Sequence, residues 1–231
     1  MKLRALNQDA KSTFDNIYRN LIWGPGDQDN GGGSGLGSGV NYTTNCRNIL
    51  YDVIKRYNIS SLLDVPCGSM SWMPLLLENI TNEIPNFRYH GIDVVESIIN
   101  SSKIKYSNRS NEWKLSVLDF SRQRLPSNYD LIFSRDALQH LPLVKVIDSL
   151  KLISRTIGAR YLLVGSYLQN GQNKDIEIGD YFPIDLTKRP FNLNKYVEVF
   201  DEKTVEFKHL ILYDIKNYLR FVNFDQIYYN I

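Results

Sequence analysis

Short apolar segments alternate with segments of helical periodicity through the middle of this sequence, and this alternation constrains the fold more than any other feature. The apolar segments are residues 61–65, 87–93, 113–119, 129–134 and 159–166. The helical patterns lie near residues 70–82, 95–107 and 136–156. The predicted strands are too apolar to have a face in water, which favours a parallel sheet with helices on both faces. We therefore expect an α/β fold with a doubly wound sheet and right-handed crossovers.

The N-terminal part follows a different pattern. Apolar residues at steps of three and four predict amphipathic helices over about 6–21 and 42–57. The stretch between them, GPGDQDNGGGSGLGSG from Gly24, holds more than half of the chain's 14 glycines. This composition is typical of a flexible linker, or of a lid that orders over a ligand, because glycine lets backbone N–H groups approach closely. We expect residues 1–57 to form an N-terminal helical lid.

The C-terminal part begins with a long polar segment. Residues 166–195 have no clear period, and a loop of this length in a compact domain is usually functional. Two β segments around a polar turn are predicted after it. With 231 residues and 43% hydrophobic content, the chain can bury one good-sized core. We expect a single domain over residues 1–231, with the sheet-containing core over 58–213.

Charge and cysteine content disfavour several classes of partner without excluding them. The net charge of +2 gives no electrostatic footprint for tight binding to nucleic acid or to a membrane surface. Cys46 and Cys67 are too few for a disulfide framework, which fits a reducing compartment, and we expect a cytoplasmic protein. Nowhere do about 18 apolar residues run together, as a membrane-spanning helix would need.

Acidic residues stand at the carboxyl ends of three successive predicted strands, namely Asp64, Asp93 and Asp119. Ligands of doubly wound sheets bind outside these ends. Asp93 suits the two hydroxyls of a ribose, and Asp119 with the adjacent Phe120 suits a purine. A lone aspartate at such a position can equally cap the next helix. Three in register favour a nucleoside site.

The turn after the first strand, DVPCGSM, lacks the glycines of a dinucleotide site. Pro66 stands where the first glycine of G-x-G-x-x-G is expected, Met70 replaces the third, and only Gly68 remains. No G-x-x-x-x-G-K-[ST] sequence occurs. We therefore expect no pyrophosphate here. A nucleoside without phosphates, such as the adenosyl part of S-adenosylmethionine, needs fewer close backbone approaches.

Four stretches in order, LLDVPCGSMSWM, YHGIDVVESII, LSVLDF and YDLIFSRDALQHLP, resemble the motifs of class I S-adenosylmethionine-dependent methyltransferases. The chain is also similar to a bacterial-type subgroup of small methyltransferases with a glycine-rich N-terminal stretch and a GDYFPIDLTKRPFNL-like loop. The resemblance runs from about Gly35 to Phe200. It implies a Rossmann-like seven-stranded sheet, mostly parallel with an antiparallel strand near the C-terminus. The implied cofactor is S-adenosylmethionine, with S-adenosylhomocysteine as product.

The resemblance also implies which residues bind the cofactor. The turn after the first strand would meet the methionine part, Asp93 the ribose, and Asp119 with Phe120 the adenine. Trp72 would wall the pocket, although it could instead pack beneath the following helix. The full expected set is Asp64, Pro66, Cys67, Gly68, Trp72, Asp93, Val94, Asp119, Phe120, Ser134 and Arg47.

The segment SRDALQHLP supplies the candidate catalytic residues. Methyl transfer to a hydroxyl needs positioning and a base that removes the proton. Asp136 and His140 are spaced i, i+4 on the predicted helix, so both would lie on one face, where His140 could accept the proton and Asp136 orient it. Arg135 is grouped with them. In the alternative interpretation, Asp136 caps the helix and His140 packs beside Leu141.

The polar segment after Ser166 supplies the candidate acceptor contacts, Asp175, Asp180, Tyr181 and Asp185, with Asn173 near them. Carboxylates and a ring face suit a polyhydroxylated ligand, so we expect a sugar, a glycan or another small polar acceptor. A divalent cation against a vicinal diol is an alternative, but no D-x-D-type cluster supports it, and no metal site is expected.

Three functions therefore stay in view. The first is O-methylation of a small polar acceptor, and the second is N-methylation of a protein or peptide. The third is a binding module that keeps the fold without catalysis. Residues 134–137 lack the proline and aromatic residues with which many nucleic-acid amino-methylases stack a flipped base. The oligomeric state, a homodimer included, is left open.

Overall fold

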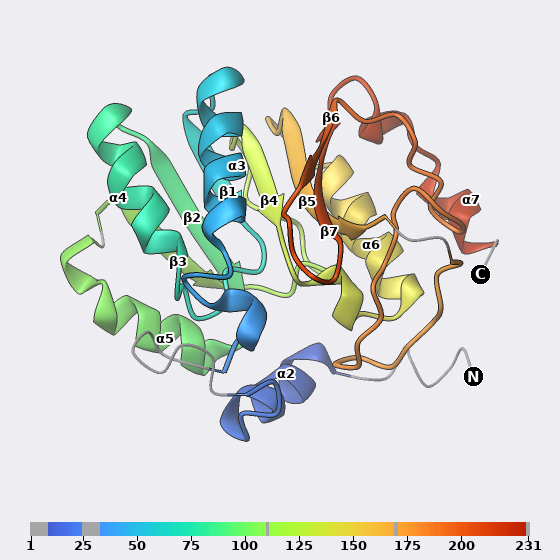
Figure 1. Cartoon of the computed structure of the whole chain (residues 1–231), viewed down its shortest axis with the longest axis horizontal. Helices are drawn as coiled ribbons and strands as arrows, with labels where there is room; N and C mark the ends of the chain where they lie inside the picture. The colour runs from blue at the N-terminus through green and yellow to red at the C-terminus, as the bar shows by residue number, and fades with distance from the viewer. Residues whose placement is uncertain (1–8, 25–32, 110, 169–170, 230–231) are drawn as a thin grey trace.

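A seven-stranded sheet with the strand order β3-β2-β1-β4-β5-β7-β6 forms the centre of the computed structural model (Figure 1). The structure describes residues 9–24, 33–109, 111–168 and 171–229. The strands are β1 (Ser61–Asp64), β2 (Arg88–Asp93), β3 (Trp113–Val117), β4 (Leu131–Ser134), β5 (Tyr161–Tyr167), β6 (Glu198–Asp201) and β7 (Lys208–Asp214). Strands β1 to β5 pair in parallel, and β7 is antiparallel to both of its neighbours. The predicted fold class is confirmed.

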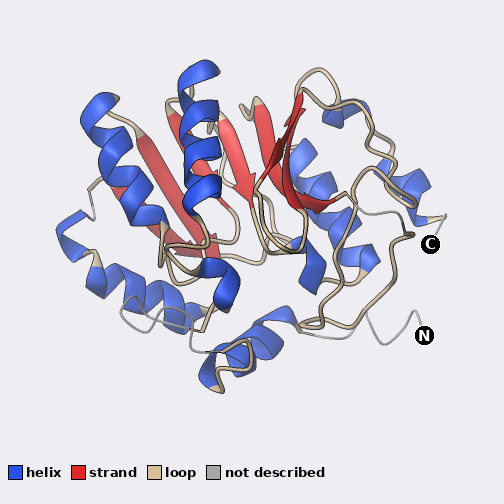
Figure 2. Ribbon diagram, in the orientation of Figure 1, coloured by secondary structure: helices blue, strands red, loops and turns tan. Residues whose placement is uncertain are grey.

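Helices cover both faces of the sheet (Figure 2). On one face pack α3 (Thr44–Arg56), α4 (Met73–Glu83) and, through Ile99, α5 (Glu96–Lys105). On the other pack α6 (Leu143–Ser154) and α7 (Phe224–Tyr228). Side chains alternate along a strand, so the adjacent Leu62 and Leu63 of β1 enter the two opposite cores, and both are fully buried. This double burial explains why the strands are continuously apolar in the sequence.

The strand order reverses between β1 and β4, since β2 and β3 continue on one side of β1 and β5 lies beyond β4. The loops that leave β1 and β4 therefore diverge and open a crevice at the carboxyl ends of the strands. Helix α2 (Ala10–Arg19) lies at this end of the sheet, at the bottom of Figure 1. Its Phe14 packs against one of the two cores.

One predicted helix is wrong in a way that matters for the site. Residues 136–156 do not form one helix: a 3-10 turn spans Leu138–His140, and α6 begins only at Leu143. Leu141, before Pro142, is extended because proline disfavours the helical conformation of the preceding residue. Asp136 has a φ of 52°. Asp136 and His140 therefore do not share a helix face, and the i, i+4 argument for them fails.

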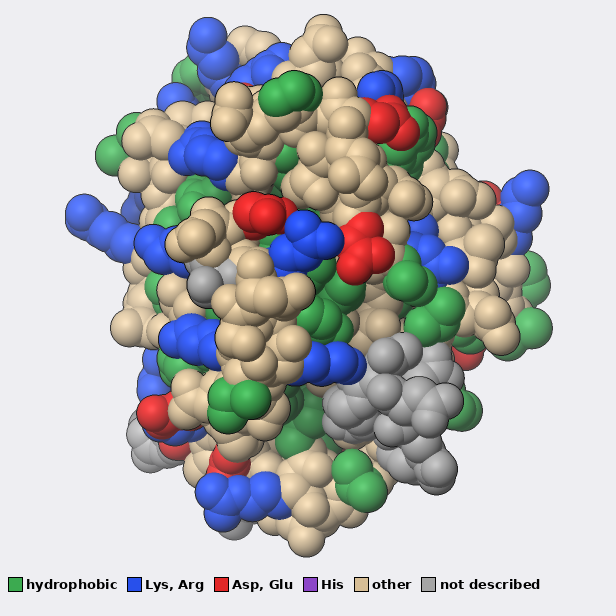
Figure 3. Space-filling model, turned by 90° about the vertical axis from the view of Figure 1, so that its left-hand side faces the viewer, with side chains coloured by type: hydrophobic (Ala, Val, Ile, Leu, Met, Phe, Trp, Pro, Cys, Tyr) green, Lys and Arg blue, Asp and Glu red, His purple; other side chains and the backbone are tan. Residues whose placement is uncertain are grey.

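Some sequence expectations fall on residues that the structure does not describe. These are Leu6 of the first predicted helix and residues 25–32 of the glycine-rich stretch. None of the described helices has the length and apolar character needed to cross a lipid bilayer. The described lysine and arginine side chains on the face shown in Figure 3 are dispersed among acidic and polar groups rather than gathered in one area.

Candidate active site

A cavity of about 970 Å³, its open mouth included, lies at the crevice outside the strand ends. Most of the predicted cofactor residues line it: Asp64, Pro66, Cys67, Gly68, Trp72, Asp93, Val94, Asp119 and Phe120. The candidate catalytic residues Arg135, Asp136 and His140 line it as well. Strand ends and the segment after β4 thus contribute to one cavity.

The turn after β1 is bonded within the protein rather than open to a phosphate. The Cys67 N–H donates to the Ile92 carbonyl at 2.8 Å, and the Gly68 N–H donates to Oδ2 of Asp93 at 3.1 Å. Pro66 has no N–H to offer. Gly68 and Met70 both have φ above 50°. The amides that a pyrophosphate would need are already used, which agrees with the absence of the usual glycines.

Two buried carboxyl groups lie at this end of the cavity, and Asp93 is the one whose pKa leaves it mostly ionised near pH 7. Asp64 accepts a hydrogen bond from the Tyr89 hydroxyl at 2.8 Å, and burial raises the pKa of its carboxyl to about 8. Burial also raises the pKa of Asp93 to about 6, against the opposing effect of the Val95 and Gly68 amides. Within the described part of the chain, neither carboxylate has an ion-pair partner. S-adenosylmethionine carries a sulfonium and an ammonium group at its methionine end, so this donor set fits it.

Asp119 combines a structural role with a place in the cavity. Its Oδ1 accepts hydrogen bonds from the Ser121 amide at 2.9 Å and the Ser121 hydroxyl at 2.7 Å, which fixes the turn after β3. A carboxylate has acceptor capacity on its second oxygen as well. Phe120 lines the cavity and packs partly against the core. The pair can therefore present an acceptor and a ring face, as predicted for an adenine.

Two residues of the expected cofactor set do not line the cavity. Arg47 donates from Nη1 to the Val40 carbonyl at 2.6 Å and to the Thr43 hydroxyl at 2.7 Å, so it holds the start of α3. Ser134 is 1% exposed at the end of β4. Arg47 and Ser134 are thus not among the residues that line the cavity, and the guanidinium of Arg47 bonds to the segment before α3 instead.

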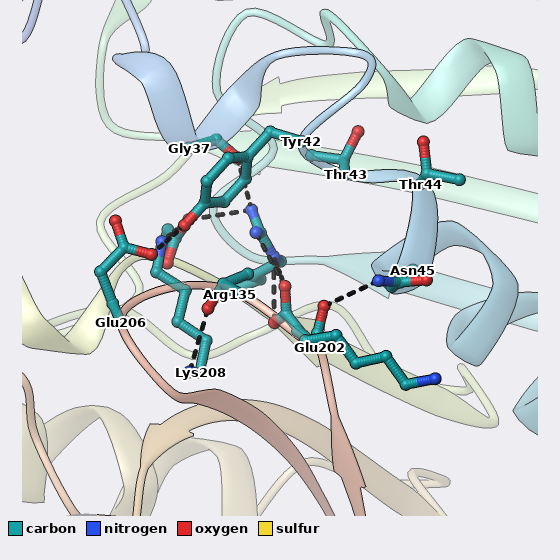
Figure 4. A network of polar contacts seen from close by, with 12 residues as sticks. Gly37, Tyr42, Thr43, Thr44, Asn45, Arg135, Glu202, Glu206 and Lys208 are labelled. Atoms are coloured by element: carbon teal, nitrogen blue, oxygen red, sulfur yellow. Dashed lines mark hydrogen bonds and ion pairs between the residues drawn. The ribbon is translucent and has the colours of Figure 1, made fainter.

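Arg135 lies in a buried network of charges (Figure 4). Its Nε and Nη2 pair with Oε2 of Glu202 at 3.0 and 2.8 Å, and its Nη1 donates to the Gly37 carbonyl at 2.9 Å. Asp136 receives Arg135 at 2.8 Å and Lys208 at 3.1 Å. Burial alone would raise the pKa of Asp136, but the two cations hold it below its usual range. Arg135 therefore connects the glycine-rich segment to the β6–β7 hairpin.

His140 is positioned by the backbone of the loop after β5. Its Nδ1 lies 2.8 Å from the Asp180 carbonyl, and the Gly179 N–H donates back to the His140 carbonyl at 2.9 Å. A carbonyl oxygen only accepts, so Nδ1 carries the proton and Nε2 of the neutral ring has the lone pair. Burial lowers the pKa of the imidazole, which keeps the ring neutral near pH 7. The orienting role predicted for Asp136 belongs to the Asp180 carbonyl, since no hydrogen bond joins Asp136 to His140.

The acidic residues expected to bind an acceptor do not line the cavity. Asp175 accepts the Leu143 N–H at 2.8 Å at the start of α6, and Asp185 is buried and accepts the Thr187 amide and hydroxyl at 2.8 and 2.7 Å. Both therefore organise the chain. Tyr181 lies beside His140 at a ring distance of 5.7 Å.

The N-terminal segment, which the sequence predicts to be a lid, forms a wall of the cavity with residues that were not among the predicted site residues. The wall consists of Ala10, Phe14, Tyr18, Trp23, Ser34 and Ser38. Trp23 stacks on His140 with ring centroids 4.4 Å apart. Ser34 Oγ hydrogen-bonds with the hydroxyls of Tyr18 and Ser69, each at 3.0 Å. The sequence signal was a run of aromatic residues that ends immediately before the glycine-rich stretch.

Comparison with known proteins places the fold. The sequence matches no protein-family model, and no curated protein is significantly similar to it. Magnesium protoporphyrin IX methyltransferase (ChlM) from Synechocystis PCC 6803, with bound S-adenosylmethionine, has a TM-score of 0.59 at 12% identity, over 89% of this chain and 96% of that one. PigF with S-adenosylhomocysteine has a TM-score of 0.60 at 14% identity, over 89% and 63%. The methyltransferase domain of bacterial CtHen1 has a TM-score of 0.57 at 14% identity, over 74% and 96%.

The chain therefore has the fold of class I S-adenosylmethionine-dependent methyltransferases.

Proposed function

We propose that the protein binds S-adenosylmethionine in this cavity and methylates a hydroxyl group of a small-molecule acceptor. The observation that carries the proposal is the shared cavity: strand-end carboxylates suited to a cationic nucleoside meet a histidine whose Nε2 has a lone pair. When bound, the cofactor supplies an electrophilic methyl group. The residues of this chain supply positioning and a base.

The proposed reaction is a nucleophilic displacement at the methyl carbon. The acceptor oxygen forms a bond to the methyl carbon while the carbon–sulfur bond breaks and its electron pair stays on sulfur. His140 takes the hydroxyl proton at Nε2, and the Asp180 carbonyl keeps the ring oriented through Nδ1. Asp136 lies close enough to favour the protonated imidazole electrostatically. Arg135 acts in this proposal as a positioning residue rather than as a catalytic one.

The carboxylates of the polar segment 166–195 do not support a particular class of acceptor. A sugar or glycan was expected from its carboxylates, but Asp175 and Asp185 are engaged in turns and a helix start. The residues that can contact an acceptor are therefore those that line the cavity.

Isothermal calorimetry with S-adenosylmethionine and S-adenosylhomocysteine tests the proposal. We expect saturable binding, which the Asp93→Ala variant weakens by about tenfold or more, equivalent to about 1.4 kcal/mol. The matched control is Glu78→Gln on the exposed side of α4, which should bind as the native chain does. The absence of binding at millimolar ligand would contradict the proposal.

A further inference from the structure

The N-terminal wall of the cavity holds three aromatic rings and no charged side chain, and this composition bears on the acceptor. Phe14, Tyr18 and Trp23 come from α2 and the turn after it. In the segment after β4, Ala137 and Leu141 lie near His140 in the sequence and also line the cavity. Ring faces and aliphatic groups thus surround one imidazole, and the polar residues that also line the cavity on this side are Ser34, Ser38, Arg135 and Asp136.

The rings are arranged in continuous contact. Trp23 lies 5.8 Å from Phe14 and 5.9 Å from Tyr18, centroid to centroid, and 4.4 Å from His140 at an interplanar angle of 32°. Such an array offers offset-stacked and edge-to-face contacts to a further flat ring. A pyranose would need several hydrogen-bond partners for its hydroxyls, but the hydroxyls of Tyr18 and Ser34 already bond to each other.

The charged groups near this end are compensated. Arg135 is paired with Glu202 and Asp136, and Asp136 is paired with Lys208 as well. Burial raises the pKa of Tyr18, so its hydroxyl stays neutral. An acceptor that carries a charge would find no opposite charge free to receive it, which favours a neutral molecule.

The base also selects among hydroxyl groups. His140 is a weak base because burial lowers its pKa. Proton transfer is efficient when donor and acceptor pKa values are close. A phenol, with a pKa of about 10, is far closer to an imidazole than an alcohol whose hydroxyl resembles that of water, about 15.7.

We propose that the acceptor is a neutral, planar aromatic compound with a phenolic hydroxyl, whose ring lies against the Trp23 wall with its oxygen at Nε2 of His140. This inference rests on the proposed function and deepens it. The bonds and the proton move as in the displacement described above, with a phenol in place of a general hydroxyl compound.

The test uses the full chain saturated with S-adenosylhomocysteine, so that acceptor binding is measured without turnover. The probes are 2-naphthol, methyl glucoside and a lysine-containing peptide. We expect 2-naphthol alone to raise the melting temperature. Trp23→Leu should weaken naphthol binding by about tenfold, and Trp23→Phe should retain most of it. Phe221→Leu replaces a 78% exposed aromatic residue outside the cavity and serves as the matched control.

The outcomes separate the two proposals. If the glucoside or the peptide stabilises the complex more than 2-naphthol does, or if Trp23→Leu behaves as Phe221→Leu, the aromatic acceptor is refuted while methyl transfer stands. If 2-naphthol does not bind at its solubility limit, the aromatic acceptor is refuted as well. If S-adenosylhomocysteine itself does not bind, the proposed function fails first. With S-adenosylmethionine present, a mass gain of one methyl on 2-naphthol supports both.

Discussion

The tautomer of His140 is set by a backbone carbonyl and not by an acidic side chain. By sequence spacing the expected partner is Asp136, four residues earlier, but Asp136 has a φ of 52° and only Leu138–His140 form a 3-10 turn, so no helix aligns the two side chains. The Asp180 carbonyl takes that place from a loop 40 residues later. A side-chain partner can be lost by a single substitution, whereas a carbonyl is present whatever residue stands at position 180.

This arrangement predicts a specific phenotype for His140→Gln. Turnover should fall by about 10²–10⁴-fold because the base is lost, while the affinity for S-adenosylhomocysteine stays unchanged. In the native protein, turnover should persist below the ordinary imidazole pKa of about 6.5 and decline only as the pH falls through the lowered pKa of His140, because protonation of Nε2 removes the lone pair.

His209→Gln on β7 is the matched control for that variant, because His209 does not line the cavity. Steady-state kinetics with calorimetry measure both properties. Equal turnover in the two variants would show that His140 is not the base.

At the scale of elements, the glycine-rich segment and the β6–β7 hairpin are held together through Arg135. The bond to the Gly37 carbonyl and the pair with Glu202 meet at one guanidinium (Figure 4). A Cβ at Gly37 would lie 2.8 Å from Oδ2 of Asp136, so the segment approaches the network as closely as only glycine allows. The described part of the predicted lid is therefore fixed by buried charges.

Removing one partner of this pair should destabilise the protein more than removing both. Arg135→Met alone leaves Glu202 buried without a counter-charge, and we expect a loss of about 3–5 kcal/mol in the free energy of unfolding. The double variant Arg135→Met/Glu202→Leu should recover a large part of that loss. Urea denaturation measures the free energies, and hydrogen exchange over residues 33–42 should rise in both variants. Additive losses would contradict this coupling.

The sequence was informative where the physics is local. Apolar strands, helix periods and the aspartates at strand ends follow from neighbouring residues, and Asp64, Asp93 and Asp119 all line the cavity as expected. The failures involve long-range partners. The capping of α6 by Asp175 and the stacking of Trp23 on His140 depend on how distant segments meet. Hydrophobic periodicity and residue spacing carry no information about contacts between segments that are distant in the sequence.

On the scale of the whole molecule, the cavity costs stability. Asp64 and Asp93 are placed without counter-charges in the interior, where the ionised form of a carboxyl is disfavoured. Binding of a cationic ligand would offset this cost. The ligand should therefore raise the free energy of unfolding by more than it would if the pocket held no buried carboxyl groups.

The pH dependence of unfolding should reveal this cost. The pKa of Asp64 is raised from about 3.9 in the unfolded chain to about 8 in the folded one, so its contribution is present below about pH 4 and is lost as the pH rises towards 8. Asp64→Asn should therefore gain stability relative to the native protein across that window, by about 1–3 kcal/mol near pH 8.

Urea denaturation of the free protein at about pH 5 and about pH 8 measures that gain. The exposed Asp52→Asn on α3 is the control and should show no such trend. A stability difference between Asp64→Asn and the native chain that does not vary with pH would contradict the raised pKa.

The two ends of the cavity come from different stretches of the chain. Strand ends and their turns build the nucleoside end, whereas α2 and the residues that follow it build the aromatic wall. Tyr18 of α2 connects the two, because its hydroxyl bonds to Ser34 and Ser34 bonds to Ser69 beside the turn. Substitutions at Phe14 or Trp23 that leave Tyr18 in place would reshape the wall without breaking this connection, so these two positions are where directed evolution of acceptor preference should begin.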